Sequence, residues 1–212
     1  MPDPSIFDQM LASVLGMGML QWMATLFGIA YVILAAKESP WCWPIGLVSV
    51  VMAFFVYINP NVKLYSDAIL QVFYAGMSVY GWWAWTRNGT ENKVEDNPVT
   101  IGMWPWQNHL IALGGGVVLA GLLGLMWSQL GAALPYIDAM TSAFSVIATF
   151  MVTRKILENW LYWIVIDTVC IFVYIHRELY LFAILFLVYA IVAAVGYYEW
   201  RRAYQDSLVH DL

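Results

Sequence analysis

The stretch LYSDAILQVFYA at residues 64–75 returns, with changes, as LYLFAILFLVYA at residues 179–190. The offset between the two copies is 115, and ten of the twenty-four positions from 64 to 87 are identical to their counterparts. Shared apolar composition alone would rarely keep one register so well, so the chain contains an internal repeat. Three identities beyond the quoted stretch are Gly81 with Gly196, Trp85 with Trp200 and Arg87 with Arg202.

The repeat extends towards the N-terminus at a different offset. At an offset of 120, Glu38 and Trp43 fall on Glu158 and Trp163. This alignment predicts a unit of three helices, with a five-residue difference between the second and third helices. It also places Leu47 opposite Asp167, and the offset of 115 places Phe186 opposite Gln71.

The composition places these helices in a membrane. Hydrophobic residues make up 62% of the 212 residues and charged residues 11%, against about 25% charged in an average soluble domain. A helix needs roughly 20 apolar residues to cross the hydrocarbon core. Apolar stretches near that length lie at 19–36, 42–58, 65–85, 109–130, 139–152, 160–175 and 179–200, of which the fifth is the least secure.

We therefore expect an all-α membrane protein with seven transmembrane helices in a 3+1+3 arrangement. The repeat is parallel, because three helices plus one linker helix is an even number of crossings. The expected parts are an N-terminal segment 1–18 with an interfacial helix from residue 5, a first repeat 19–87, a polar cytoplasmic linker 88–107, a linker helix 108–131, a second repeat 138–202 and a cytoplasmic tail 203–212.

Basic residues predict the orientation. Seven fall on one side of the membrane, namely Lys37, Arg87, Lys93, Arg154, Lys155, Arg201 and Arg202, and two on the other, Lys63 and Arg177. The positive-inside rule then places the C-terminus in the cytoplasm. Whether the N-terminal segment crosses the membrane stays open.

The sequence lacks the residues that several classes of function require. The three histidines lie at span ends or in the tail, so no catalytic or metal-binding cluster is indicated, and no cofactor is expected. The net charge of −5 provides no basic patch for nucleic acid. A channel would need a ring of charge or a filter segment, and neither is present. We expect a protein that is not an enzyme.

Polar residues follow one face of the third predicted helix. Asp67, Gln71, Tyr74 and Ser78 recur at steps of four, three and four. Polar groups on one face of a span seldom face lipid, so they either line a pathway or hydrogen-bond to neighbouring helices. Gln71 and Tyr74 lie deeper in the span and favour the pathway.

The sixth predicted helix carries a similar stripe of Trp160, Trp163, Asp167, Cys170 and Tyr174. Asp167 is seven residues into the span, roughly 10 Å deep. Ionisable groups at such depth usually face a cavity or a partner, which makes Asp167 the leading candidate. The alternative is a structural contact with a neighbouring helix.

Tryptophans offer flat surfaces for a ligand. Most of the twelve, including Trp85 and Trp200, are expected in the interfacial belts. Trp43 and Trp163, which the offset of 120 makes equivalent, begin inward stripes. An aromatic face beside a carboxylate suits a planar organic cation. A non-transporting scaffold, whose polar stripes only join helices, is the competing class.

The run RKILENWLYW at residues 154–163, followed by Asp167, resembles the PnuC family of vitamin transporters, as do the segments 70–74 and 80–85. The likeness extends from about residue 23 to 202. It implies a fold similar to the SWEET sugar transporters, facilitated diffusion of nicotinamide riboside or thiamine across the bacterial inner membrane, uptake driven by a cytoplasmic kinase, and a homotrimer. One departure is Asp167, where enterobacterial carriers of the family have Asn.

A small cationic vitamin is therefore the expected partner, with nicotinamide riboside first and thiamine as the alternative. The candidate substrate-binding residues are Trp43, Gln71, Tyr74, Asn159, Trp160, Trp163, Asp167 and Tyr189.

Overall fold

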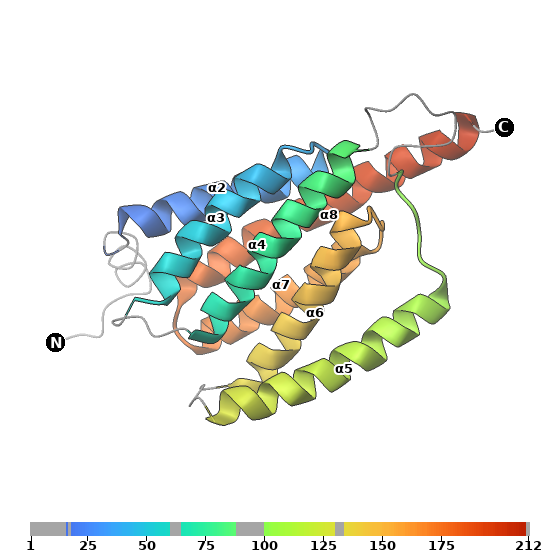
Figure 1. Ribbon diagram of the computed structural model, residues 1–212. Helices are drawn as coiled ribbons and strands as arrows, with labels where there is room; N and C mark the ends of the chain where they lie inside the picture. The colour runs from blue at the N-terminus through green and yellow to red at the C-terminus, as the bar shows by residue number, and fades with distance from the viewer. Residues whose placement is uncertain (1–15, 17, 60–64, 88–99, 130–133, 211–212) are drawn as a thin grey trace.

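The computed structural model describes residues 16, 18–59, 65–87, 100–129 and 134–210. In this part of the chain it contains seven helices and no strand beyond an isolated bridge between Gly102 and Ile156, which confirms the all-α prediction. The predicted interfacial helix falls almost entirely outside the described residues. The helices are α2 (Met19–Ala36), α3 (Cys42–Tyr57), α4 (Tyr65–Thr86), α5 (Trp106–Gln129), α6 (Pro135–Thr153), α7 (Asn159–His176) and α8 (Tyr180–His210) (Figure 1).

The helices carry their apolar side chains outward. Five of those described, α2, α5, α6, α7 and α8, are long and apolar enough to cross a membrane, and α3 is a shorter apolar helix. On α7, Val165 and Phe172 are 64% and 68% exposed, whereas Asp167 is 3% exposed. An apolar outside around a polar inside is the arrangement that lipid favours.

Two helices differ from their predicted spans. The span predicted at 139–152 is part of a 19-residue helix, because Pro135 starts α6 in its first turn and the charged residue Asp138 is helical as well. The last helix continues to His210, well beyond the predicted span end at residue 200. No proline or glycine follows Gly196, so nothing in this sequence stops the helix where its apolar part ends.

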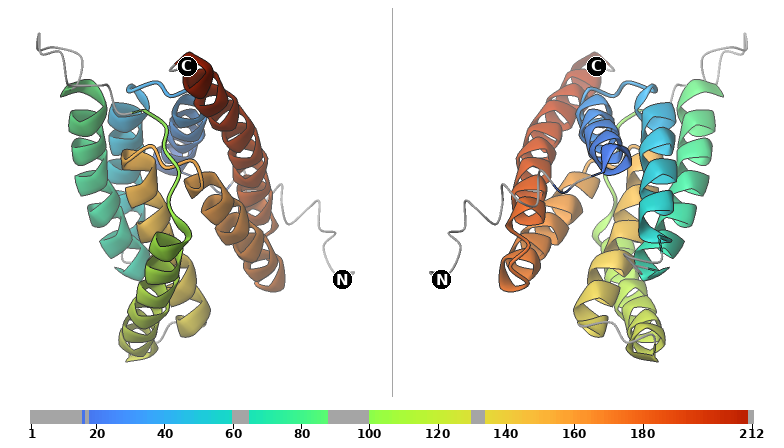
Figure 2. Two further views of the ribbon diagram at one scale, coloured as in Figure 1. Left: turned by 90° about the vertical axis from the view of Figure 1, so that its right-hand side faces the viewer. Right: turned by 90° about the vertical axis from the view of Figure 1, so that its left-hand side faces the viewer.

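Six of the seven helices form a closed ring. The main contacts run from α2 to α3, α3 to α4, α4 to α6, α6 to α7, α7 to α8 and α8 back to α2, while α5 packs against α6 on the outside. Figure 2 shows α3 and α4 on one side of the molecule and α7 and α8 on the other. The helices of the two predicted repeats thus meet along two seams, α2 with α8 and α4 with α6.

Matched contacts support the predicted repeat. Trp43 packs its indole on Gly81 and lies edge-on to Trp85, with ring centroids 5.4 Å apart. Trp160 packs its indole on Gly196 and lies edge-on to Trp200, also at 5.4 Å. Each glycine lets a tryptophan approach its helix backbone closely. The same three-residue arrangement therefore occurs in both halves of the ring.

These contacts correct the predicted register. Trp43 corresponds to Trp160 at an offset of 117, so the predicted equivalence of Trp43 with Trp163 at an offset of 120 is wrong. The first residues of α3 and α7 are also 117 apart. The offset between α4 and α8 is 115, so the loops between the second and third helices of the two repeats differ by two residues, not five. Val50, and not Leu47, then corresponds to Asp167.

The two halves exchange hydrogen bonds at one end of the ring. Trp85 Nε1 donates to the Thr153 carbonyl at 3.2 Å, and Trp200 Nε1 donates to the Ala35 carbonyl at 3.1 Å. Lys155 Nζ donates to Glu38 Oε2 at 3.0 Å. Trp200 is fully buried, so its expected place in an interfacial belt is wrong. The indoles of Trp85 and Trp200 instead tie together helices that are far apart in sequence.

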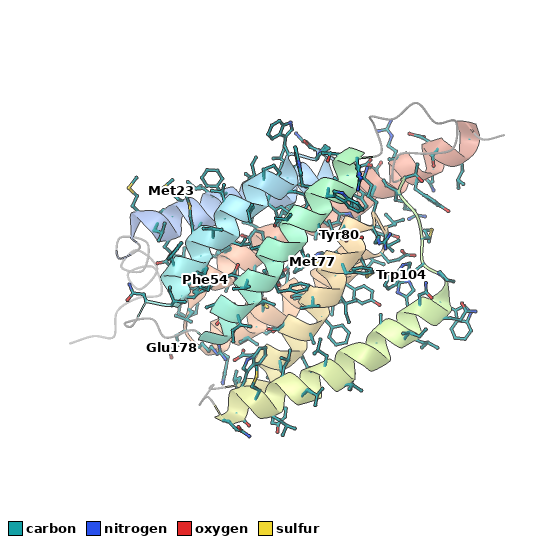
Figure 3. All side chains as sticks on the ribbon, in the orientation of Figure 1. Met23, Phe54, Met77, Tyr80, Trp104 and Glu178 are labelled. Atoms are coloured by element: carbon teal, nitrogen blue, oxygen red, sulfur yellow. The ribbon has the colours of Figure 1, made fainter. Side chains whose placement is uncertain are left out.

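We expect Glu178→Gly to raise the free energy of unfolding by about 1 kcal/mol. Glu178 follows α7 with φ at 59°, where a Cβ is strained and glycine is not. It is exposed at the end of the bundle where α8 begins (Figure 3). Thermal unfolding in detergent measures the change. Glu199→Gly, in the interior of α8, is the control and should lower stability; equal effects of the two substitutions would contradict the strain at Glu178.

Candidate functional site

A cavity of about 360 Å³ lies inside the ring. Its walls come from all six ring helices, and α5 contributes nothing to them. Ligand sites in proteins start at about 300 Å³, so the volume suits one small organic molecule. The cavity therefore lies between the two halves, and substrate sites of transporters built from repeats tend to lie there.

Seven of the eight predicted site residues line this cavity. They are Trp43, Gln71, Tyr74, Trp160, Trp163, Asp167 and Tyr189. Asn159 does not reach it: this side chain is fully buried at the start of α7, and its Nδ2 donates to the Ile156 carbonyl at 2.7 Å. Asn159 orders the turn that precedes Trp160. Ligand binding by these residues stays a prediction.

Asp167 is the buried carboxylate of the cavity wall. Its residue is 3% exposed, and within the described residues neither a hydrogen bond nor an ion pair involves its side chain. The described lining contains no Lys, Arg or His. A carboxylate removed from water needs a counter-charge or a proton. Asp167 is therefore the group in this wall that a proton or a bound cation would neutralise.

Two indole N–H groups at the cavity also lack protein partners. Trp43 Nε1 and Trp160 Nε1 are buried, and neither has an acceptor within the described residues. The two rings occupy matching places in the two halves of the ring. Neither Nε1 atom is accessible from the cavity, so the two rings offer it carbon surface rather than hydrogen-bond donors. The described lining thus combines aromatic faces with two carboxyl groups, of which Asp167 is the more buried.

Sequence reasoning missed part of the lining. Tyr174 was on the predicted stripe of its helix, but its counterpart Tyr57, 117 residues earlier, was not singled out. Both line the cavity, and the correct repeat offset would have paired them. Ser49 and Thr149 also reach it, but their hydroxyls donate to the carbonyls of Ala24 and Ser145. Such bonded hydroxyls form the wall rather than bind a ligand, and no sequence signal distinguishes them.

At each end of the cavity an ion pair joins two segments that are far apart in sequence. Arg177 donates to both oxygens of Asp138, at 3.1 and 3.0 Å, beyond the end of the cavity that Asp67 lines. At the other end Lys155, paired with Glu38, also lies 4.9 Å from the centre of the Trp85 ring. These four side chains therefore have partners of opposite charge within the protein, whereas Asp167 has none among the described residues.

The run at 154–163, on which the family resemblance rests, is mainly structural. Glu158 accepts a hydrogen bond from the backbone N–H of Trp104, which lies just before α5 (Figure 3). Glu158 Oε1 is also 3.8 Å from His109 Nε2. His109 Nδ1 and the Tyr162 hydroxyl are 3.1 Å apart. Glu158 and Tyr162 attach α5 to α7, so within this run only Trp160 and Trp163 face the cavity.

A family model described as nicotinamide mononucleotide transporter matches residues 18–202. The chain belongs to this family. The predicted resemblance to the PnuC transporters is thereby confirmed, and the protein is a membrane transporter, not an enzyme. With its apolar helices, it is a multi-pass protein of the inner membrane.

Curated relatives cover nearly the same part of the chain. The nicotinamide riboside transporter PnuC of Escherichia coli is 24% identical over 88% of this chain and 88% of its own. The riboflavin/roseoflavin transporter RibM of Streptomyces davaonensis is 23% identical over 87% of this chain and 86% of its own. PnuC of Neisseria mucosa is 24% identical over 92% of this chain and 73% of its own.

A solved structure has the same fold. The crystal structure of a vitamin B3 transporter PnuC superposes with a TM-score of 0.73 at 21% identity, covering 95% of this chain and 88% of that one.

Proposed function

We propose that this transporter carries nicotinamide riboside into the cytoplasm by facilitated diffusion. The observation that supports the proposal is Asp167, an unpartnered carboxylate in the wall of a cavity whose described lining holds no cationic side chain. Nicotinamide riboside is a flat ring with a fixed positive charge, an amide and sugar hydroxyls. Its charge complements Asp167, and its flat ring can stack on the aromatic side chains of the lining.

Electrostatics favours this pairing. Two opposite unit charges about 4 Å apart attract by about 4 kcal/mol at an effective dielectric constant of about 20. Part of that attraction offsets the loss of water around both groups. Stacking on Trp163 adds a cation–π attraction of about 0.5–2 kcal/mol.

Removal of the substrate inside the cell keeps net uptake going after the two sides would otherwise equilibrate. We propose that a cytoplasmic kinase phosphorylates it, since a phosphate group would add negative charge beside Asp167 and prevent return through the same cavity. The C-terminus is proposed to be cytoplasmic, in agreement with the predicted excess of Lys and Arg on that side. A homotrimer is proposed from the family resemblance.

Liposomes containing the purified protein, a trapped nicotinamide riboside kinase and ATP test the proposal. We expect the substrate to accumulate as its phosphate, and only to equilibrate when ATP is omitted. No uptake in either case would favour the non-transporting scaffold. Thiamine is the second candidate, because the Asp167 carboxylate can also accept from an aminopyrimidine, and it is tested in the same liposomes with thiamine kinase.

We expect Trp163→Ala to weaken binding of nicotinamide riboside by about 2- to 30-fold, the loss of one cation–π contact. Trp163 lines the cavity, whereas Trp83 is 49% exposed on the outer face of α4 and serves as the control. Isothermal titration calorimetry measures both affinities. An equal loss in Trp83→Ala would show that the effect does not come from the cavity.

A further inference from the structure

A second cavity, of about 480 Å³, lies outside the ring, between α4, α5 and α6. Phe73 and Met77 of α4 form one wall, and the other walls come from the start of α5 with Trp104 just before it and from the second half of α6. Met77 and Trp104 are labelled in Figure 3. The start of α5 stands away from the end of α6 (Figure 1), and this separation leaves an outer groove between the three helices.

The walls of the outer groove are apolar along most of their length. Their described polar side-chain atoms are the indole N–H of Trp104 and the amide of Asn108, both at the start of α5. α6 separates this groove from the central cavity, because Ser145 and Thr149 line the cavity and Ile147 lines the groove. No water is available in the hydrocarbon core of a bilayer to fill an apolar groove, so a hydrocarbon chain suits it.

One end of the outer groove carries a positive charge. Arg154 directly follows α6, and its guanidinium carbon is 5.7 Å from the centre of the Phe150 ring, which lines the groove. Arg154 is exposed, and its guanidinium has no ion pair among the described residues, whereas the neighbouring Lys155 has one. α5 and α6 are packed in opposite directions, so Trp104 and Asn108 lie at the same end as Arg154.

We propose that the outer groove binds one anionic phospholipid, with an acyl chain between α4 and α5 and the headgroup phosphate at Arg154. A guanidinium can donate two parallel hydrogen bonds to a phosphate, and basic pockets between transmembrane helices are known sites for anionic headgroups. An apolar length that ends in polar groups and an unpaired cation matches an anionic lipid. The bound lipid would connect α4 to α5, which packs mainly against α6, and so support the seam between α4 and α6 from outside.

Native mass spectrometry of the purified protein in a neutral detergent tests the headgroup site. We expect phosphatidylglycerol to bind about fivefold more tightly than phosphatidylcholine with the same acyl chains, and Arg154→Gln to remove this preference. Arg154→Lys should keep most of it. The matched control is Arg202→Gln, which removes an exposed charge from α8, a helix that does not line the groove, and it should leave the preference unchanged. An unchanged preference in Arg154→Gln would overturn the proposal.

A second variant pair tests the site of the acyl chain. Ala112→Phe places a ring inside the groove, whereas Val117→Phe adds one on the 57% exposed outer face of α5. We expect phosphatidylglycerol to raise the unfolding temperature of the wild type and of Val117→Phe, but not of Ala112→Phe. Inorganic phosphate, which has no acyl chain, should not displace the lipid, and displacement would contradict a lipid site. Dissociation of an oligomer by Ala112→Phe with lipid binding unchanged would show that a second copy of the chain occupies the groove.

Discussion

Asp167→Asn lowers the affinity for nicotinamide riboside by about 10- to 100-fold in our account, because the amide keeps the shape of the carboxylate and removes its charge. This corresponds to about 1.4–2.8 kcal/mol of lost charge pairing in a poorly hydrated cavity. Stability of the empty protein should be unchanged or slightly higher, since an uncompensated buried carboxyl group is replaced by a neutral one.

Calorimetry and thermal unfolding of one variant pair measure both quantities. Asp67→Asn is the matched control, because Asp67 lines the same cavity but lies near Arg177, so its substitution should change affinity much less. Unchanged affinity together with lowered stability in Asp167→Asn would show that Asp167 is a structural partner of a neighbouring helix.

Gly81→Ala should lower the free energy of unfolding by about 1–3 kcal/mol. A Cβ at Gly81 would overlap ring carbons of Trp43, which is 1% exposed and held edge-on against Trp85. The rigid indole cannot yield without entering the cavity. Gly196→Ala should act alike, since its Cβ would lie 2.8 Å from two ring carbons of Trp160.

Gly76 provides the control on the same helix as Gly81. A Cβ there would meet no atom within 4 Å, so Gly76→Ala should leave stability unchanged or raise it slightly. Thermal unfolding in one detergent compares the three variants. Equal stability of Gly81→Ala and Gly76→Ala would contradict the packing of Trp43 on α4.

The sequence predicted the helices well where hydropathy decides them. The bounds of α2 agree with the predicted span at 19–36, and Asp167, which its depth assigned to a cavity or a partner, lines the cavity. Hydropathy failed for the start of α6, because Asp138 is helical although charged. An ion pair with Arg177 makes Asp138 tolerable there, and such a partner is not visible in one sequence.

Register and side-chain partners were harder to predict. An exact match of two Glu-Trp pairs suggested the offset of 120, whereas backbone geometry pairs Glu38 with Lys155, both at positive φ. Matching residue types can thus give the wrong alignment at a turn, because two equivalent turn positions can share a backbone conformation without sharing a residue type. Asn159 is not part of the cavity lining for a related reason: its side chain donates a hydrogen bond to the turn before α7, and a sequence motif does not reveal where a side chain points.

Equilibrium binding of nicotinamide riboside, thiamine and riboflavin to the purified protein tests the central claim, that an unpartnered carboxylate in an aromatic cavity selects a vitamin cation. Riboflavin is the uncharged comparison, because a relative that is 23% identical is named as a riboflavin/roseoflavin transporter. We predict that at least one of the two cations binds with a dissociation constant well below about 1 mM and more tightly than riboflavin. Riboflavin binding tighter than either cation, or no cation binding below about 1 mM, would contradict the account.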